Sequence, residues 1–270
     1  MFDFHQDKRR YFQMQYRTAA EYIIPFIAQQ RPVIATDRIL EIGCAEAGVL
    51  RAFRELGCDC TGIELSASRV ANAEKFHAEI DAPGQVRFVT RDIYEIDVEH
   101  DLGHRFDVIV LKDVIEHIPD QARFIPRLRA FLAPGGVIFF GFPPWQMPFG
   151  GHQQVCQSRV LSKLPWFHLL PTPLFQGVLR VFGETRTTRR NLQEIKETGI
   201  TIGRFERIVR QSGLQITQRT FWLLNPIYKY KFGRGAVKQA GVIARLPGLN
   251  NFFTTAVYYV VRAADQPPVS

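Results

Sequence analysis

Two acidic side chains stand where a nucleoside ligand could be bound. Glu41 lies two residues before Gly43, in the run Arg38-Ile-Leu-Glu-Ile-Gly-Cys-Ala-Glu-Ala-Gly48, and Glu64 follows 21 residues after Gly43. Each acid lies at or near the end of a short apolar run that is typical of a buried strand. In an open α/β sheet the ligand lies at the carboxyl ends of the strands, and an acid after the second strand accepts hydrogen bonds from ribose hydroxyls. The pattern therefore predicts a nucleoside site.

The sheet that positions these acids can be followed as strands that alternate with helices. The chain starts with a helical pattern over residues 7–30, which Pro25 is expected to bend or break. This spacing predicts a doubly wound, mostly parallel α/β sheet with right-handed crossovers. The expected strands are 38–42, 59–64, 85–90, 106–111 and 137–142, and the helices between them are 48–56, about 66–80 and about 120–132.

The alternation breaks after the fifth strand. Residues 143–200 contain Gly150-Gly-His152 and several prolines, and the segment is too long for an ordinary loop, so it is predicted to be a helical insert near the site. A helix over 203–212 and an antiparallel pair of strands over 214–224 and 252–262 complete a seven-stranded sheet. We expect one domain over residues 1–270, with residues 1–30 as a helix that caps it.

The charge is distributed unevenly. Residues 1–150 hold 17 basic and 21 acidic side chains, whereas residues 151–270 hold 17 and 5, which gives the chain its net charge of +8. Such a field could attract an anionic substrate, an anionic membrane surface or nucleic acid, and it could equally be a solvated face. The four cysteines lack zinc or disulfide spacing, so no metal site is expected. Without a secretory signal or a long apolar run, we expect a cytoplasmic protein.

At this point the chain resembles the class I S-adenosylmethionine (SAM)-dependent methyltransferases, especially the group of ubiquinone-biosynthesis-like small-molecule O-methyltransferases. The family's first motif, an acid followed by Gly-x-Gly-x-Gly, is similar to Glu41-Ile-Gly-Cys-Ala-Glu-Ala47, where alanine replaces two of the three glycines. Alanine is disfavoured where φ is positive, so these replacements favour a tighter cofactor pocket.

Further motifs of the resemblance follow in the family's order. Glu64 matches the acid for the ribose hydroxyls, Asp92 in Arg91-Asp-Ile93 matches the acid for the adenine amino group, and the run from Leu111 to His117 matches the motif that ends in Glu-His. Ala133-Pro-Gly-Gly136 also matches. The resemblance implies SAM as cofactor and the following cofactor-binding residues: Glu41, Gly43, Cys44, Ala45, Glu64, Leu65, Asp92, Ile93 and Lys112, with Tyr11 and Tyr16 from the first helix closing over the cofactor.

A nicotinamide dinucleotide enzyme is the main rival, because Gly43-x-Ala45-x-x-Gly48 differs by one methyl group from that fingerprint. Glu41 would then place a carboxylate beside a diphosphate, whereas the methyltransferase family uses this acid near the ammonium group of SAM. Asp92 has no matching role in a dinucleotide enzyme, and the antiparallel strands after strand five also disfavour it.

Two histidines are candidates for catalysis. His117 follows the fourth strand, and His152 lies in Phe149-Gly-Gly-His-Gln-Gln154 beyond the fifth strand, where acceptors bind in this family. Either could serve as a base for an alcohol acceptor, and either could instead be structural, as a helix-start or loop residue. The two glycines before His152 indicate close backbone approach or a hinge.

The acceptor is expected to be a small molecule, apolar or lipid-like, with a hydroxyl or carboxyl group. The segments 160–170 and 174–182 mix apolar, aromatic and basic residues, which suits a lid over such an acceptor, peripheral contact with an anionic membrane, or a helical subdomain packed on the sheet. Phe142-Pro-Pro-Trp145 lacks the Asn or Asp of amino-group methyltransferases, so nucleic acid is disfavoured. An RNA or protein methyltransferase, and a SAM-binding protein without transferase activity, remain the alternatives. The sequence does not predict the oligomeric state.

Overall fold

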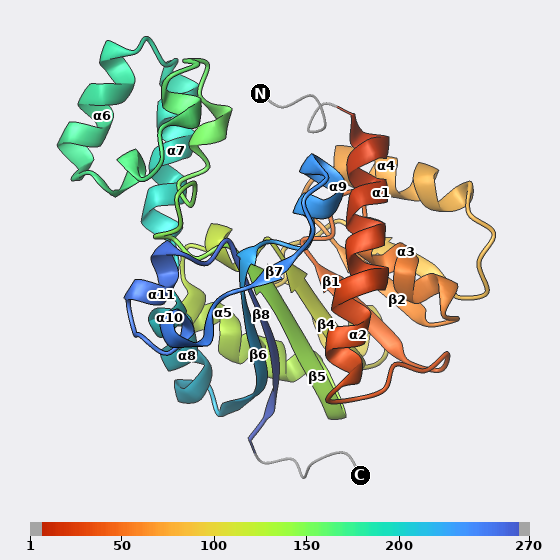
Figure 1. Ribbon diagram of the computed structural model, residues 1–270. Helices are drawn as coiled ribbons and strands as arrows, with labels where there is room; N and C mark the ends of the chain where they lie inside the picture. Colours follow the sequence, from red (N-terminus) through yellow and green to blue (C-terminus); the bar gives the residue numbers. More distant parts are fainter. Residues whose placement is uncertain (1–6, 265–270) are drawn as a thin grey trace.

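The computed structural model describes residues 7–264, and its centre is a single twisted sheet (Figure 1). The strand order is β3-β2-β1-β4-β5-β8-β6-β7. The first five of these are mutually parallel, and β8 is antiparallel to both β5 and β6. The strands are β1 Arg38–Ile42, β2 Asp59–Ile63, β3 Val86–Val89, β4 Phe106–Lys112, β5 Leu132–Phe142, β6 Leu214–Leu224, β7 Val237–Lys238 and β8 Ala256–Ala263.

The predicted mostly parallel α/β architecture is confirmed, with differences in three strands. The last strand, β8, begins at Ala256 instead of 252, because residues up to Phe252 form a short helix. The structure adds a short eighth strand, β7, which pairs with the end of β6. Strand β5 starts at Leu132 instead of 137, because Phe106 pairs with Leu132 while Val108 pairs with Val137. The segment Ala133-Pro-Gly-Gly136 between these pairs bulges out of the ladder, with Gly135 at φ +75°. The expected turn therefore lies within a longer strand.

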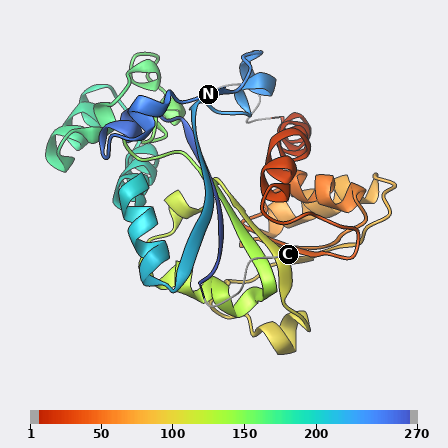
Figure 2. The ribbon, with the colours of Figure 1, turned by 60° about the horizontal axis from the view of Figure 1, so that its bottom comes forward.

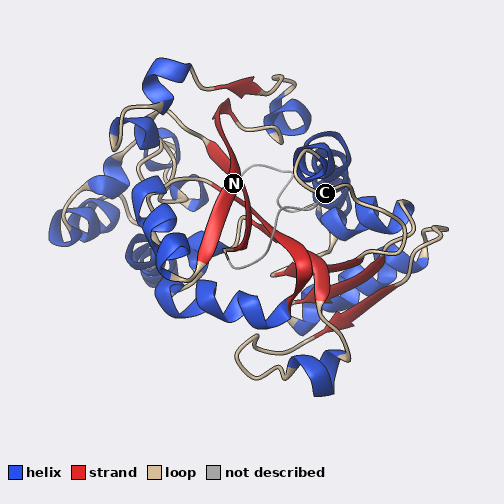
Figure 3. Cartoon of the chain, turned by 90° about the horizontal axis from the view of Figure 1, so that it is seen from below, coloured by secondary structure: helices blue, strands red, loops and turns tan. Residues whose placement is uncertain are grey.

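Helices cover both faces of the sheet, as the views from other directions show (Figures 2 and 3). On one face, apolar residues of the N-terminal helices and of α3 and α4 pack on the sheet, and on the other face those of α5 and α8 do so. Both faces of the central strands are thus buried, which explains why β4 is almost wholly apolar. These helices are α3 Gly48–Glu55, α4 Ala67–Ala78, α5 Gln121–Arg127 and α8 Ile202–Gln211.

The N-terminal helix continues past Pro25 without a break. Helix α1 (Lys8–Thr18) is followed by a π-helical turn over Ala19–Ile23 and by α2 (Ile24–Ala28), and the Ile24 N–H donates to the Ala19 carbonyl. Proline lacks an N–H and its ring crowds the carbonyl four residues earlier, so the wider turn before Pro25 accommodates it. Residues 1–6 of the expected cap lie outside the described residues, as do residues 265–270 of the expected domain.

The segment after β5 forms a helical insert that projects beyond the carboxyl edge of the parallel strands (Figure 1). Its main helices are α6 (Thr172–Val181) and α7 (Arg186–Thr198), and it has a small apolar core of its own. Between β6 and β8 the chain forms the short helices α9 (Tyr228–Phe232), α10 (Gly241–Ala244) and α11 (Leu249–Phe252). In the part of the chain that the structure describes, no helix is both long and apolar enough to cross a bilayer.

Candidate active site

The turn after β1 is held in a left-handed conformation at alternate residues. Gly43, Ala45 and Ala47 have φ values of +68°, +49° and +60°. A β-carbon on Gly43 would lie 2.8 Å from Val114 Cγ2, so the turn lies directly against the segment that follows β4. The two alanines occupy the conformation that glycine would adopt without strain, at a cost of roughly 1–2 kcal/mol each. The turn therefore keeps its glycine-like shape despite the replacements.

The start of α3 lies in close contact with α1. A β-carbon on Gly48 would lie 2.4 Å from the Phe12 carbonyl oxygen, so only glycine allows the two backbones to approach. Lys8 Nζ also pairs with Glu46 Oε1 in the turn at 3.0 Å. This contact places α1 beside the turn and the carboxyl edge of the sheet.

Glu64 closes the turn from the end of β2. One carboxylate oxygen accepts a hydrogen bond from the Ala45 N–H and the other from the Ser66 N–H, each at 3.0 Å. A carboxylate can accept about four hydrogen bonds, so each oxygen can accept a further one from a ligand hydroxyl. Leu65, the next residue, is 70% exposed and lies at the surface.

Glu41 is a buried carboxylate without a complete set of partners. It is 4% exposed, and its Oε2 has no hydrogen-bond partner among residues 7–264. Burial raises the pKa of Glu41 well above its usual value, and the nearby charge of Lys112 opposes that rise. A buried carboxylate oxygen left unpaired is costly, so this position is suited to a cationic ligand group.

Asp92 and Ile93 lie at the same edge, beyond β3. The Glu64 N–H donates to the Val89 carbonyl at 3.1 Å, which brings the ends of β2 and β3 together. Asp92 Oδ1 accepts a hydrogen bond from the Tyr94 N–H at 2.9 Å, and Ile93 is buried. The three acids therefore lie at the carboxyl ends of three neighbouring strands along one edge.

The remaining cofactor candidates separate into two groups. Tyr11 lies at the site beside Lys231, and burial together with the charge of Asp113 raises its pKa. Cys44 is buried in the turn, and burial raises the pKa of its thiol. Tyr16 is not brought to this edge: its hydroxyl donates to Glu55 Oε2 at 2.7 Å, at the far end of α3. The periodicity that placed both tyrosines on one helix did not reveal that Tyr16 faces α3 whereas Tyr11 faces α9.

Asp113 is a central residue that the sequence analysis did not single out. It follows β4 with φ +56°, and its side chain forms an ion pair with the buried Lys112. Burial would raise the pKa of Asp113, but the charge of Lys112, a hydrogen bond with it, and the charges of Lys231 and His152 lower it on balance. Aspartate tolerates the left-handed region better than most residues, which is the weak signal that the sequence held.

The two predicted histidines are brought together beyond β4 and β5. The rings of His117 and His152 are 5.0 Å apart at an interplanar angle of 75°. Burial lowers the pKa of His117, which favours a neutral ring at neutral pH. The glycines before His152 are required for close approach, since a β-carbon on Gly151 would lie 2.3 Å from His168 Cβ and one on Gly150 would lie 2.2 Å from the Trp145 carbonyl oxygen.

Glu116 lies beside these rings and was also missed as a site residue. It sits in the 3-10 turn Ile115–His117 and is 4% exposed. Burial and the charge of Asp113 raise its pKa well above the usual value. Its backbone carbonyl accepts a 2.6 Å hydrogen bond from the Thr198 hydroxyl at the end of α7, which ties the insert to this turn.

Helix α9 adds a lysine from a segment that is distant in sequence. Lys231 Nζ lies 5.3 Å from the centre of the Tyr11 ring, and burial lowers the pKa of Lys231 to about 8. The sequence shows this segment as the basic run Tyr228-Lys-Tyr-Lys-Phe232 and gives no sign that one lysine turns inward. The site is thus bounded by α1 and α9 above the ends of β1, β4 and β5 (Figure 1).

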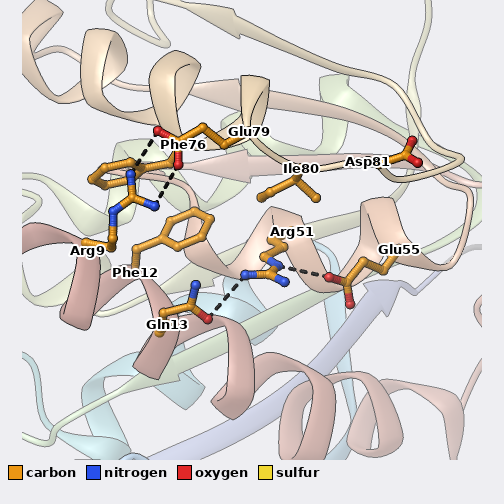
Figure 4. Close-up of a pocket in the computed structure, with 9 residues that line it drawn as sticks. All are labelled: Arg9, Phe12, Gln13, Arg51, Glu55, Phe76, Glu79, Ile80 and Asp81. Atoms are coloured by element: carbon orange, nitrogen blue, oxygen red, sulfur yellow. Dashed lines mark hydrogen bonds and ion pairs between the residues drawn. The ribbon is translucent and has the colours of Figure 1, made fainter.

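A separate cavity of about 330 Å³ lies between α1, α3 and α4 (Figure 4). It is lined by Phe12, Phe76 and Ile80 together with the ion pairs Arg9–Glu79 and Arg51–Glu55. None of the predicted cofactor or catalytic residues lines it. This cavity is therefore distinct from the site at the carboxyl edge.

The geometry indicates that different parts of that edge bind different ligands. The ends of β1, β2 and β3 carry acids suited to the hydroxyl and cationic groups of a nucleoside ligand. The ends of β4 and β5 carry Asp113, His117 and His152, which can orient a second molecule or hold a proton. The contact between Gly43 and Val114 makes the two parts adjacent.

Comparison with known sequences gives two kinds of match. Residues 12–164, more than half of the chain, match a family model described as a methyltransferase domain. Over 101 residues the chain is 36% identical to a ubiquinone biosynthesis O-methyltransferase of Nitrobacter winogradskyi, covering 37% of this chain and 36% of that protein. A protein of the same description from Histophilus somni is 27% identical over 144 residues, covering 49% of this chain and 58% of that protein. In both, the chain spans less than two thirds of the relative.

Solved structures resemble the whole fold at low sequence identity. Magnesium protoporphyrin IX methyltransferase from Synechocystis, with bound S-adenosylhomocysteine (SAH), has a TM-score of 0.54 at 11% identity, covering 92% of this chain and 82% of that one. Geranyl diphosphate methyltransferase in complex with SAM has a TM-score of 0.56 at 12% identity, covering 92% and 85%. At such identity these matches show the fold alone.

Proposed function

Since the chain belongs to this family of methyltransferase domains, we propose that it is a SAM-dependent methyltransferase that methylates an oxygen of a small apolar or lipid-like molecule with a hydroxyl or carboxyl group. The observation that carries this proposal is the meeting of His117 and His152 beside the cofactor turn. They come from two segments that follow adjacent strands, and the ring separation of 5.0 Å leaves both able to face one acceptor.

In this proposal the acids of the first three strands bind the cofactor. Glu64 accepts the ribose hydroxyls, Asp92 accepts from the adenine amino group, and the unpartnered Glu41 oxygen receives the ammonium group. SAM carries two positive groups and one carboxylate, so a site rich in carboxylates is complementary to it. Gly43, Cys44 and Ala45 form the turn against it, while Leu65, Ile93, Lys112 and Tyr11 complete the surroundings.

Methyl transfer is an in-line displacement at the sulfonium methyl group. The acceptor oxygen forms a bond to the methyl carbon, the carbon–sulfur bond breaks, and its electron pair stays on sulfur to give SAH. The protein must chiefly hold the oxygen and the methyl group in line. An alcohol must also lose its proton, and either His152 or His117 is placed to accept it.

The insert supports an apolar or lipid-like acceptor. Leu174 and Val181 of α6 and Phe182 at its end are 60%, 84% and 44% exposed. Arg180 lies between them in sequence, and Arg186 follows at the start of α7. Exposed apolar side chains mixed with arginines suit contact with an apolar molecule or an anionic lipid surface. Because Thr198 ties the insert to Glu116, such a surface would be coupled mechanically to the site.

The test is methyl transfer from radiolabelled SAM to a panel of acceptors: short- and long-chain phenols, fatty acids, total RNA and a mixture of soluble proteins. The proposal expects label in the phenols or acids, with preference for longer chains. Label confined to RNA or protein would overturn the acceptor class in favour of a macromolecular substrate. Binding of SAM without label in any acceptor would favour the SAM-binding protein without transferase activity.

A further inference from the structure

Three metal-ligating side chains converge at the acceptor side of the site. One ligand atom each from Glu116, His117 and His152 lies within 4.8 Å of the others. Glu116 and His117 belong to the turn that directly follows β4, and His152 belongs to the segment that follows β5. The cluster thus joins two segments that are 35 residues apart in sequence.

The carboxylate of Glu116 is an independent sign that something is bound there. It is 4% exposed, and neither of its oxygens has a hydrogen-bond partner within residues 7–264. Buried carboxylates in proteins are normally paired, hydrogen-bonded or bound to a metal ion. The groups beside this carboxylate are imidazole nitrogens. A cation bound by all three side chains would therefore give the carboxylate the partner that it lacks.

The backbone around the cluster is fixed from both sides. The Thr198 hydroxyl holds the Glu116 carbonyl, and Gly151 packs its backbone against His168 immediately before His152. His168 is itself buried, with Nε2 2.9 Å from the Trp145 carbonyl oxygen. Two of the three side chains therefore project from anchored backbone, and His117 directly follows Glu116 in the same turn.

The spacing fits a transition metal after a small adjustment. Histidine and carboxylate ligands lie about 2.0–2.2 Å from zinc, so two ligands at a tetrahedral angle are about 3.3–3.6 Å apart. The three ligand atoms lie within 4.8 Å of one another, so side-chain shifts of about 1 Å would bring them to this spacing. Two imidazoles and one carboxylate are a donor set that Zn²⁺ and related divalent ions accept, with at least one coordination position left open.

We propose that Glu116, His117 and His152 form a binding site for a divalent transition metal ion, with Zn²⁺ as the best-fitting ion. This inference rests on the proposed function: the open coordination position would take the acceptor hydroxyl beside the cofactor. A bound metal ion lowers the pKa of a coordinated hydroxyl, so the oxygen would lose its proton to solvent before it attacks the methyl group. The two histidines then serve as ligands, and the proton is removed without a histidine base.

The binding test uses untagged full-length protein that has been stripped with a chelator and dialysed. Titration with Zn²⁺ by calorimetry, and with Co²⁺ by its visible absorption, is expected to show one site per chain. Glu116→Gln and His152→Ala should each weaken binding at least about tenfold. His100→Ala, which removes an exposed histidine beside Asp101, is the matched control and should bind as the wild type does.

Failure of this inference is distinguishable from failure of the proposed function. Glu116→Gln is nearly isosteric and should keep its SAM affinity, which the same calorimeter measures and which also reports that the variant is folded. Absence of a Zn²⁺ or Co²⁺ site in the wild type, or equal affinity in Glu116→Gln, would overturn the metal site while leaving methyl transfer standing. Stoichiometric metal in the wild type that is lost in both variants would support it.

Discussion

The two halves of the candidate site differ in how they are assembled. The acids and the turn of the cofactor half come from residues 41–93, where each acid lies at the carboxyl end of its own strand and the intervening helices return the chain to the same edge. The acceptor half gathers Asp113, Glu116 and His117 from one turn, His152 from the insert and Lys231 from α9. Cofactor recognition is therefore local in sequence, whereas acceptor recognition depends on long-range contacts.

The energetics of the halves differ as well. In the cofactor half, Glu64 already accepts backbone hydrogen bonds, so this part is largely formed without its ligand. In the acceptor half, both oxygens of the buried Glu116 carboxylate lack a hydrogen-bond partner in the described chain. The turn of the first half is therefore preorganised, with one Glu41 oxygen left for the ligand, whereas in the second half neither oxygen of Glu116 is paired within the described residues. Substitutions in the two halves should therefore separate cofactor affinity from turnover.

The largest effect is expected for His152→Ala. Removal of the imidazole takes away a base or a metal ligand, so turnover should fall about 100-fold, which is typical for loss of such a group. SAM affinity should stay at the wild-type value, because His152 lies on the acceptor side. Steady-state kinetics and calorimetry measure the two quantities, with His100→Ala as the control. Lost SAM affinity with normal turnover would move His152 to the cofactor half.

Glu64→Ala should have the opposite effect and should weaken the binding of SAM. It removes a charged carboxylate that accepts two hydrogen bonds from the ribose hydroxyls, so SAM binding should be about 10–100-fold weaker. Glu79→Ala removes an exposed carboxylate that pairs with Arg9 in the outer cavity, and it should leave SAM affinity unchanged. Calorimetric titration with SAM compares the two variants. Equal affinity of Glu64→Ala and the wild type would show that the acid after β2 does not bind the cofactor.

Glu41→Gln should stabilise the cofactor-free protein at neutral pH while weakening SAM binding. Burial raises the pKa of Glu41 above its ordinary value of 4.5, so the native state retains this proton longer than the unfolded chain. The stability that this proton gives is present at acidic pH and is lost as pH rises from about 4.5 through the native pKa. Removing the charge should therefore add on the order of 1–3 kcal/mol near pH 7.

Urea unfolding of the cofactor-free wild type and Glu41→Gln across pH 4 to 8 measures this effect. The difference between the two proteins should grow with pH. A difference that shrinks as pH rises would mean that the carboxylate is stabilised in the native state, and the proposed place for the ammonium group would then be wrong.

Ala45→Gly should give the smallest change in the free energy of unfolding, and unlike most substitutions it should stabilise the protein. Ala45 adopts φ +49°, where glycine has no steric cost, so the variant should be about 1 kcal/mol more stable, less the greater freedom of glycine in the unfolded chain. Ala71→Gly, at an exposed position within α4, should instead lose about 1 kcal/mol. Urea unfolding tests both. Destabilisation of Ala45→Gly would show that the methyl group contributes packing that outweighs the strain.

The contrast between the halves also explains what the sequence could predict. The five parallel strands and the acids that follow them were predicted because buried strands, turn residues and spacing are local signals. The bulge at Ala133-Pro-Gly-Gly136 looked like a separate turn, because nothing local shows that Leu132 already pairs with Phe106. The π-helical turn before Pro25 likewise depends on how the helix packs.

The parts of the site that were missed are those set by tertiary structure. His117 and His152 were both predicted, but their ring contact depends on how the insert packs against the turn after β4. Asp113 and Glu116 lie inside the motif that ends at His117, and only His117 was predicted from it as a catalytic candidate. Lys231 looked like one of many surface lysines, because only the fold of the segment between β6 and β8 brings it beside Tyr11.

The most direct test of the account is a structure of the protein with SAH bound. The account predicts the ribose hydroxyls at Glu64, the ammonium group at Glu41, and the sulfur directed past Val114 toward Asp113, His117 and His152. SAH bound in the cavity between α1, α3 and α4, or with its sulfur facing away from the two histidines, would contradict the division between cofactor and acceptor halves.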